Sequence, residues 1–144
     1  MDLTAPAEKM SKSTSSAAGA LRILDETSLL RRKIMRAVTD GGTTVTYDPD
    51  GAPGVANLLD ILGGCTRTPP HQLATRFDRY GELKKAVADA VVDCLAPIRE
   101  RHLQLVAEPG HVHAVLRAAG AERARGLASE KLRHAKTAIG LLPS

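Results

Sequence analysis

Aromatic residues are almost absent from this 144-residue chain, which has no tryptophan, two tyrosines and one phenylalanine. Aliphatic residues and alanine must therefore supply most of the 43% of the sequence that is hydrophobic. A core of Leu, Val, Ile and Ala suits close-packed helices better than a sheet, in which β-branched and aromatic residues usually dominate. The composition favours a helical fold.

Cysteine and long apolar runs are also scarce. The two cysteines, Cys65 and Cys94, lie far apart in the sequence and neither belongs to a Cys-x-x-Cys pair. This argues against a disulfide scaffold or a zinc site and predicts two free thiols in a reducing compartment. No apolar run approaches the ~20 residues of a membrane span, and the first residues do not read as a signal peptide. We expect a soluble cytoplasmic protein that contacts no membrane.

Charged residues make up 25% of the chain, and its formal net charge is +4. This mildly basic balance is compatible with RNA or phosphate as a partner but does not specify one. The length leaves room for one hydrophobic core of ordinary size.

The apolar spacing predicts an all-α fold with five or six helices behind an irregular N-terminal segment. A first helix is expected over residues 27–39, a second over 55–61 with a glycine C-cap at 63–64, and a short third over 68–77. From residue 82 the apolar residues step by three or four through a long helix, which we expect to bend near Pro97. After Pro109-Gly110, a C-terminal helical pair is expected, with the interruption at Gly120.

The side chains that could form other catalytic sites are better explained as structural residues. The five histidines lack carboxylate or cysteine partners at ligand spacing, so we expect surface or capping roles and no protein metal site. Four aspartates fit turns and caps better than an acid–base pair; they are Asp40, Asp48, Asp50 and Asp60.

One short stretch does suggest chemistry: Lys9-Met10-Ser11-Lys12-Ser13, which precedes a Ser/Thr/Ala/Gly run ending at Gly19. Lysine ammonium groups on a flexible loop can close over a triphosphate and stabilise the charge that develops on departing pyrophosphate. The alternative is a disordered, solvated tail, which such a composition also fits. Arg31, Arg32, Lys33 and Arg36 form a basic group further on that we expect to be a solvated helix face.

The pentapeptide is identical to the KMSKS motif of class I aminoacyl-tRNA synthetases. The sequence that follows resembles the bacterial tryptophanyl-tRNA synthetase family from this loop onward, and the resemblance extends over essentially the whole chain. Two of the matching blocks, Ala-Val-Thr-Asp and Pro-Gly-Val-x-Asn-Leu-Leu, separate the family from its tyrosyl relative. The blocks lie in order at residues 19–25, 33–40, 47–49, 53–59, 80–84, 120–124 and 140–143.

The resemblance implies ATP-dependent attachment of tryptophan to tRNA(Trp) through a tryptophanyl-adenylate. It assigns catalytic roles to Lys9 and Lys12, and contact with the ATP phosphates to Lys9, Met10, Ser11, Lys12 and Ser13. ATP would enter as its magnesium complex. The resemblance also divides the chain into residues 1–24, a loop and connector left from a catalytic α/β domain, and residues 25–144, a helical domain that recognises the anticodon region of the tRNA.

The family's nucleotide-binding half, its tryptophan pocket and most of its homodimer interface have no counterpart in this sequence. We therefore expect a truncated tryptophan--tRNA ligase that is inactive alone, because catalysis needs those groups held in one geometry. A separate N-terminal half is one potential partner. The alternatives are a non-enzymatic helical module that binds tRNA or a partner protein, and a decayed gene fragment. A missing neighbour should also leave apolar surface uncovered, which we expect around residues 21–30 and 55–62.

Overall fold

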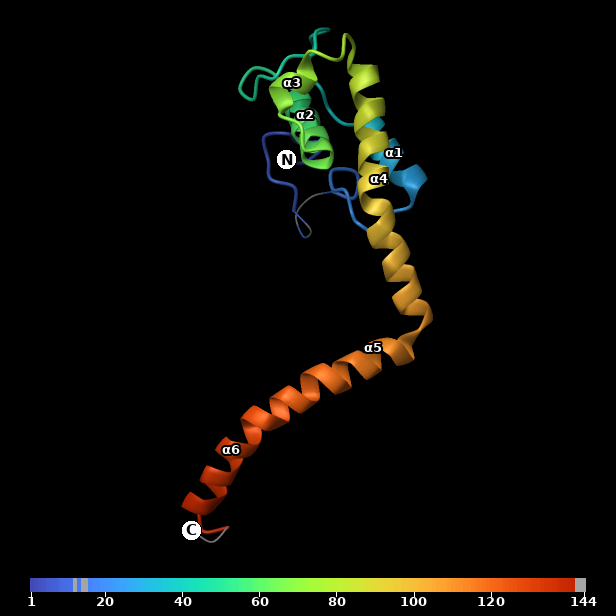
Figure 1. Ribbon diagram of the computed structural model, residues 1–144. Coiled ribbons are helices and arrows are strands. Elements are labelled where there is room, and N and C mark those ends of the chain that lie inside the picture. The colour runs from blue at the N-terminus through green and yellow to red at the C-terminus, as the bar shows by residue number, and fades with distance from the viewer. Residues whose placement is uncertain (12, 14–15, 142–144) are drawn as a thin grey trace. The chain divides into compact units, whose positions relative to one another are not determined.

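The computed structural model describes residues 1–11, 13 and 16–141. Every regular element in this part of the chain is helical, which confirms the expected all-α class. The α-helices are α1 (Thr27–Met35), α2 (Pro53–Thr66), α3 (Pro70–Ala74), α4 (Tyr80–Ala107), α5 (Pro109–Val115) and α6 (Glu122–Ala138); a π-helical segment, η1 (Leu116–Ala121), joins the last two (Figure 1).

The chain divides into two compact units, Met1–Arg99 and Glu100–Ser144. The first unit holds α1 to α3 and most of α4, together with the irregular N-terminal segment. The resemblance to the family predicts a different division, between a catalytic-domain remnant ending at residue 24 and a helical domain starting at residue 25. That division remains a prediction.

One hydrophobic core fills the first unit. Leu30 and Ile34 of α1 are buried, as their spacing predicts, and Leu83, Val87 and Val91 repeat along the buried face of α4. The middle of α2 supplies most of the remainder, with Val55, Leu58, Leu59 and Leu62 all buried. The expectation of exposed apolar surface over residues 55–62 is therefore wrong, because α2 turns its apolar side chains into this core.

Two features of the expected helices need correction. Val38 is exposed, because α1 ends at Met35 instead of continuing to residue 39. The second helix does not end at Gly63-Gly64 but continues to Thr66, and Arg67 ends it in the left-handed conformation at φ 55°. Gly63 stays helical where a side chain would not fit, since a Cβ there would lie 2.8 Å from the Thr68 carbonyl oxygen.

Polar contacts join α1 and the residues directly after it to α4. Arg31 forms an ion pair with Asp89, the Lys84 ammonium donates to the Ala37 carbonyl oxygen at 2.9 Å, and Arg99 donates to Thr27 Oγ1 at 3.1 Å. These contacts fix α1, which directly follows the loop of interest, to the longest helix of the unit.

The long helix expected around Pro97 is confirmed as α4, which has Pro97 in its interior. In the second unit, α5 and α6 form the expected helical pair, and their join at η1 contains Gly120. A π-helical turn is a local widening of a helix, so the chain stays helical past this glycine.

Candidate functional site

The lysine loop starts and ends within the first unit, and its described residues are mostly accessible. Lys9 and Ser13 are exposed, while Met10 and Ser11 are half-buried. Ser11 Oγ accepts a hydrogen bond from the Ser13 amide at 3.4 Å. The catalytic residue Lys12 expected from the motif lies outside the described residues.

The segment entering the loop is held by the core of the unit. The Leu3 side chain is buried, its amide donates to the Gly19 carbonyl oxygen at 2.9 Å, and its own carbonyl oxygen accepts from the Val38 amide at 2.8 Å. From α2, the buried Asn57 amide group donates to the Met1 carbonyl oxygen at 3.1 Å and to the Asp2 carbonyl oxygen at 3.3 Å. The entry to the loop is thus tied to both α2 and the residues after α1.

The Asp2 carboxylate lies beside Gly19, where the two ends of the loop meet. It is buried and accepts hydrogen bonds from the Thr4 amide at 2.7 Å, the Thr4 hydroxyl at 2.8 Å and the Ala5 amide at 3.1 Å. A Cβ on Gly19 would lie 2.1 Å from Asp2 Oδ1, so any larger residue there would have to displace this hydrogen-bonded carboxylate. Residues 3 and 19 are therefore held next to each other, through the hydrogen bond between Leu3 and Gly19 and the close packing of Asp2 against Gly19.

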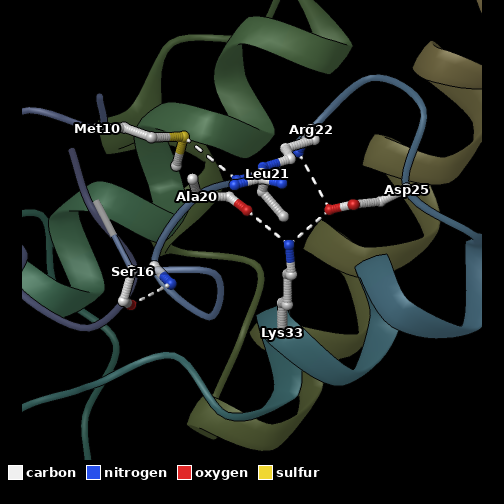
Figure 2. A network of polar contacts seen from close by, with 8 residues as sticks. Met10, Ser16, Ala20, Leu21, Arg22, Asp25 and Lys33 are labelled. Carbon is white, nitrogen blue, oxygen red and sulfur yellow. Dashed lines mark hydrogen bonds and ion pairs between the residues drawn. The ribbon is translucent and has the colours of Figure 1, made fainter. Parts of the chain in front are cut away.

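The segment leaving the loop is tied to α1 by Lys33. This lysine is only 7% exposed, and its ammonium group donates to the Ala20 carbonyl oxygen at 2.8 Å and to Asp25 Oδ2 at 2.5 Å (Figure 2). The same Asp25 oxygen accepts from the Arg22 amide at 3.2 Å. Lys33 was expected on a solvated face, and that expectation is wrong because its charge is paired inside the turn at residues 20–25.

The pentapeptide itself reaches this turn through Met10. The Met10 sulfur accepts a hydrogen bond from the Leu21 amide at 3.4 Å (Figure 2). On the other side of the turn, the Gly19 amide donates to Ser16 Oγ at 3.0 Å. The described residues at the base of the loop are therefore held by one cluster of polar contacts. Lys9 lies in the exposed part of the loop.

A small cavity of about 210 Å³ with a mostly apolar surface adjoins the loop. It is lined by Thr4 and Ala17-Ala18 from the loop, and by Leu29, Arg32, Lys33 and Arg36 from α1 and its C-terminal end. Arg32 and Arg36 are exposed, whereas the Lys33 ammonium is paired with Asp25.

The groups set aside in the sequence have structural contacts. Asp48 Oδ1 accepts from the Asp50 and Gly51 amides in a turn, as expected for that residue. Asp60 accepts from the Tyr47 hydroxyl, which raises the pKa of Tyr47, and Asp40 accepts from the Tyr80 hydroxyl. Among the described residues no group of three or more His, Cys, Asp or Glu side chains could hold a metal ion, and no helix is long and apolar enough to cross a membrane.

Both cysteines line a larger cavity of about 660 Å³ between residues of α2, α3 and α4. Burial, followed by the neighbouring Cys94, raises the pKa of the Cys65 thiol to about 11. A thiol held in this way is mostly protonated at neutral pH and is a poor nucleophile.

Sequence reasoning missed two residues that shape the site, Lys33 and Asn57. A lysine within the apolar repeat of α1, and an asparagine between Val55 and Leu58 in an apolar helix, were the available signals. A polar residue that the helical period places on a buried face must find a partner.

The comparisons with known proteins agree on one family. Residues 1–96 match the sequence model of tRNA synthetases class I (W and Y). The chain is 52% identical to tryptophan--tRNA ligase 1 of Streptomyces coelicolor over 143 residues, covering 99% of this chain and 42% of the relative. It is 45% identical to the tryptophan--tRNA ligase of Leifsonia xyli subsp. xyli, covering 98% of this chain and 42% of the relative.

Among solved structures, the tryptophanyl-tRNA synthetase from Mycoplasma pneumoniae matches with a TM-score of 0.65 at 29% identity. That match covers 73% of this chain and 34% of the other. The chain thus spans about 42% of the length of its curated relatives and corresponds to their C-terminal part.

Proposed function

Because the chain belongs to the class I tRNA synthetases, in the tryptophanyl-tRNA synthetase family, we propose that it supplies the phosphate-binding loop and C-terminal helices of a tryptophan--tRNA ligase. The observation that carries the proposal is the unaltered pentapeptide at residues 9–13 on a loop whose two ends are fastened to a packed core.

In the proposed reaction, a carboxylate oxygen of tryptophan attacks the α-phosphorus of ATP. The bond from that phosphorus to the bridging oxygen breaks, and pyrophosphate leaves with the bonding electrons. Negative charge grows on the departing oxygens, and the Lys9 and Lys12 ammonium groups would stabilise it. Lys9 is exposed and the Ser13 hydroxyl lies on the same accessible loop, which suits contact with a triphosphate that enters as its magnesium complex.

The tryptophanyl group would then pass from the adenylate to the end of tRNA(Trp). We propose that the chain alone does not complete either step, since it covers 42% of its relatives' length and a reaction of two substrates needs all the positioning groups in one site. A complementing N-terminal half would provide the remainder.

The test is tryptophan-dependent exchange of pyrophosphate into ATP, measured for this chain and for a fusion. In the fusion, the N-terminal part of the S. coelicolor relative that has no counterpart here precedes Met1. We expect no exchange by the chain alone and clear exchange by the fusion, which Lys9→Ala or Lys12→Ala should reduce by about 10²–10³-fold.

Lys85→Ala, at an exposed lysine of α4, is the matched control and should leave the rate unchanged. Pyrophosphate exchange by the chain alone would refute the proposal that the chain is inactive by itself. A folded fusion without exchange, or one indifferent to Lys9 and Lys12, would refute the role of the loop.

A second candidate is a non-enzymatic module that binds tRNA, favoured by the charge of α6. Its exposed basic residues outnumber its acidic ones, namely Arg123, Arg125, Lys131, Arg133 and Lys136 against Glu122 and Glu130. Filter binding of tRNA at two salt concentrations separates the candidates, because affinity from phosphate contacts falls steeply with salt. Tight, salt-dependent binding by the chain alone, together with an inactive fusion, would favour the module.

A further inference from the structure

We propose that Lys33 is a positioning residue for the lysine loop, which it holds through the peptide group between Ala20 and Leu21. This inference concerns how the loop is placed and rests on the proposed function only for its effect on catalysis. The structural part stands on contacts within the first unit.

Lys33 and Met10 bind the two sides of one peptide group. The Ala20 carbonyl oxygen accepts from the Lys33 ammonium at 2.8 Å, and the Leu21 amide donates to the Met10 sulfur at 3.4 Å (Figure 2). The carbonyl and the amide belong to the same planar unit, so fixing its oxygen also fixes the direction of its N–H group. Lys33 therefore sets where Met10, the second residue of the pentapeptide, is held.

The Lys33 ammonium is itself firmly placed. Asp25 is only 12% exposed in its side chain, and its Oδ2 lies between the ammonium at 2.5 Å and the Arg22 amide at 3.2 Å. The Asp25 amide donates back to the Arg22 carbonyl oxygen at 3.0 Å, which closes the turn. A charged donor shared by a carboxylate and a carbonyl makes stronger hydrogen bonds than a neutral one would.

The opposite side of the loop base is fixed without Lys33. The Leu3 amide donates to the Gly19 carbonyl oxygen at 2.9 Å, so residue 19 is held from the entry side while residue 20 is held from α1. Loss of the ammonium should therefore free residues 20–25 and Met10 while leaving the pairing of residues 3 and 19 in place. This local pattern distinguishes positioning from a general contribution to stability.

Lys84 provides a matched control. Like Lys33, it donates its ammonium group to a backbone carbonyl oxygen, that of Ala37 at 2.9 Å. The N–H group of the same peptide unit, that of Val38, donates to the Leu3 carbonyl oxygen, so Lys84 acts on the entry side of the loop and not on the turn at residues 20–25. The variants are Lys33→Met, which removes the charge and keeps the length, Lys33→Arg, which restores the charge, and Lys84→Met.

The first measurement is residue-resolved amide hydrogen exchange on the full chain. In Lys33→Met we expect the Leu21 and Asp25 amides to exchange at least about tenfold faster, with Leu58 and Leu59 of the core unchanged. Lys33→Arg should restore part of the protection, and Lys84→Met should leave both loop amides as in the parent. Unchanged exchange at Leu21 and Asp25 in Lys33→Met, or an equal effect of Lys84→Met, would overturn the proposal.

The second measurement is pyrophosphate exchange by the fusion described above. Lys33→Met should lower kcat by about a hundredfold with KM for tryptophan changed less than about twofold, and Lys33→Arg should recover part of kcat. If Lys33→Met does not fold, Asp25→Asn weakens the same clamp from its other partner and serves in its place. A parent fusion without activity would refute the proposed function alone, because amide exchange still decides the placement of the loop.

Discussion

At the scale of single residues, Tyr80 shows how strongly one contact can change a side chain. Its hydroxyl donates to Asp40 Oδ1 at 2.5 Å, across the connection between α1 and α2. This hydrogen bond, followed by partial burial and the carboxylate charge, raises the pKa of Tyr80 to about 12 from an ordinary value of 10.0. The protonated phenol is therefore favoured by folding.

The scarcity of aromatic residues makes this pKa measurable. Tyr47→Phe leaves Tyr80 as the sole tyrosine, and with no tryptophan present the ultraviolet absorbance of tyrosinate reports on it directly. We expect Tyr80 to titrate near pH 12, and Asp40→Asn to bring its pKa towards 10.0 because the charged acceptor is lost. Titration of the folded Tyr47→Phe protein near 10.0 would contradict the contact.

The sign of the linked stability follows from the raised pKa. The contribution of Tyr80 is complete below pH 10.0, the unfolded value, and is lost as the pH rises through about 12. We therefore expect the free energy of unfolding, measured with urea between pH 10 and about pH 12, to fall less for Tyr80→Phe than for the parent protein.

Lys33 marks the limit of what a residue's position along the sequence can reveal. The spacing of Leu30 and Ile34 correctly predicted the buried face of α1, since each depends only on the helical period. The burial of Lys33 depends on Ala20 and Asp25, which reach it from a turn with no regular period. The lysine loop was recognised from its sequence, whereas the clamp that holds it needed the three-dimensional structure.

At the scale of helices, the glycines of α2 explain the main difference from expectation. Local propensity predicted that Gly63-Gly64 would end the helix, but Gly63 is retained where the chain after α2 passes close to it. Tertiary packing overrides propensity here, and a sequence pattern does not contain that information.

The first turn of α2 offers a sharp test of such a close approach. A Cβ at Gly54 would lie 2.4 Å from the Val38 carbonyl oxygen and 3.0 Å from Thr39 Cα, both backbone atoms that cannot rotate away. We expect Gly54→Ala to destabilise the protein by about 1–3 kcal/mol, as overpacking does, in chemical unfolding monitored by circular dichroism.

Gly64 in the same helix is the matched control. A Cβ there would meet no atom within 4 Å, so only the helix propensity changes. Gly64→Ala should stabilise by about 0.5–1 kcal/mol. Equal effects of the two substitutions would show that α2 does not approach residues 38–39 as described.

At the scale of the whole molecule, the buried side chains found among the described residues all lie in the first unit. The buried apolar side chains extend no further along the chain than Val91. In the described residues of the second unit, α5 and α6 have no buried residue. The exposed large apolar side chains beyond Arg99 belong to the end of α4, to α5, to η1, to α6 and to the residues after α6; they are Leu103, Val106, Val115, Leu116, Leu127, Leu132, Ile139 and Leu141.

Helices that bury no apolar face derive little stability from packing, and isolated helices of such lengths are marginal in water. The second unit should therefore contribute almost nothing to the cooperative unfolding of the chain when it is studied alone. A truncated protein ending at Arg99 should have the same denaturant midpoint as the full chain. Its free energy of unfolding should differ from that of the full chain by no more than about 0.5 kcal/mol. In the full chain, amides of residues 100–138 should exchange far faster than those of α2. A large fall in the midpoint on truncation would show that the second unit is stabilised against the core of the first.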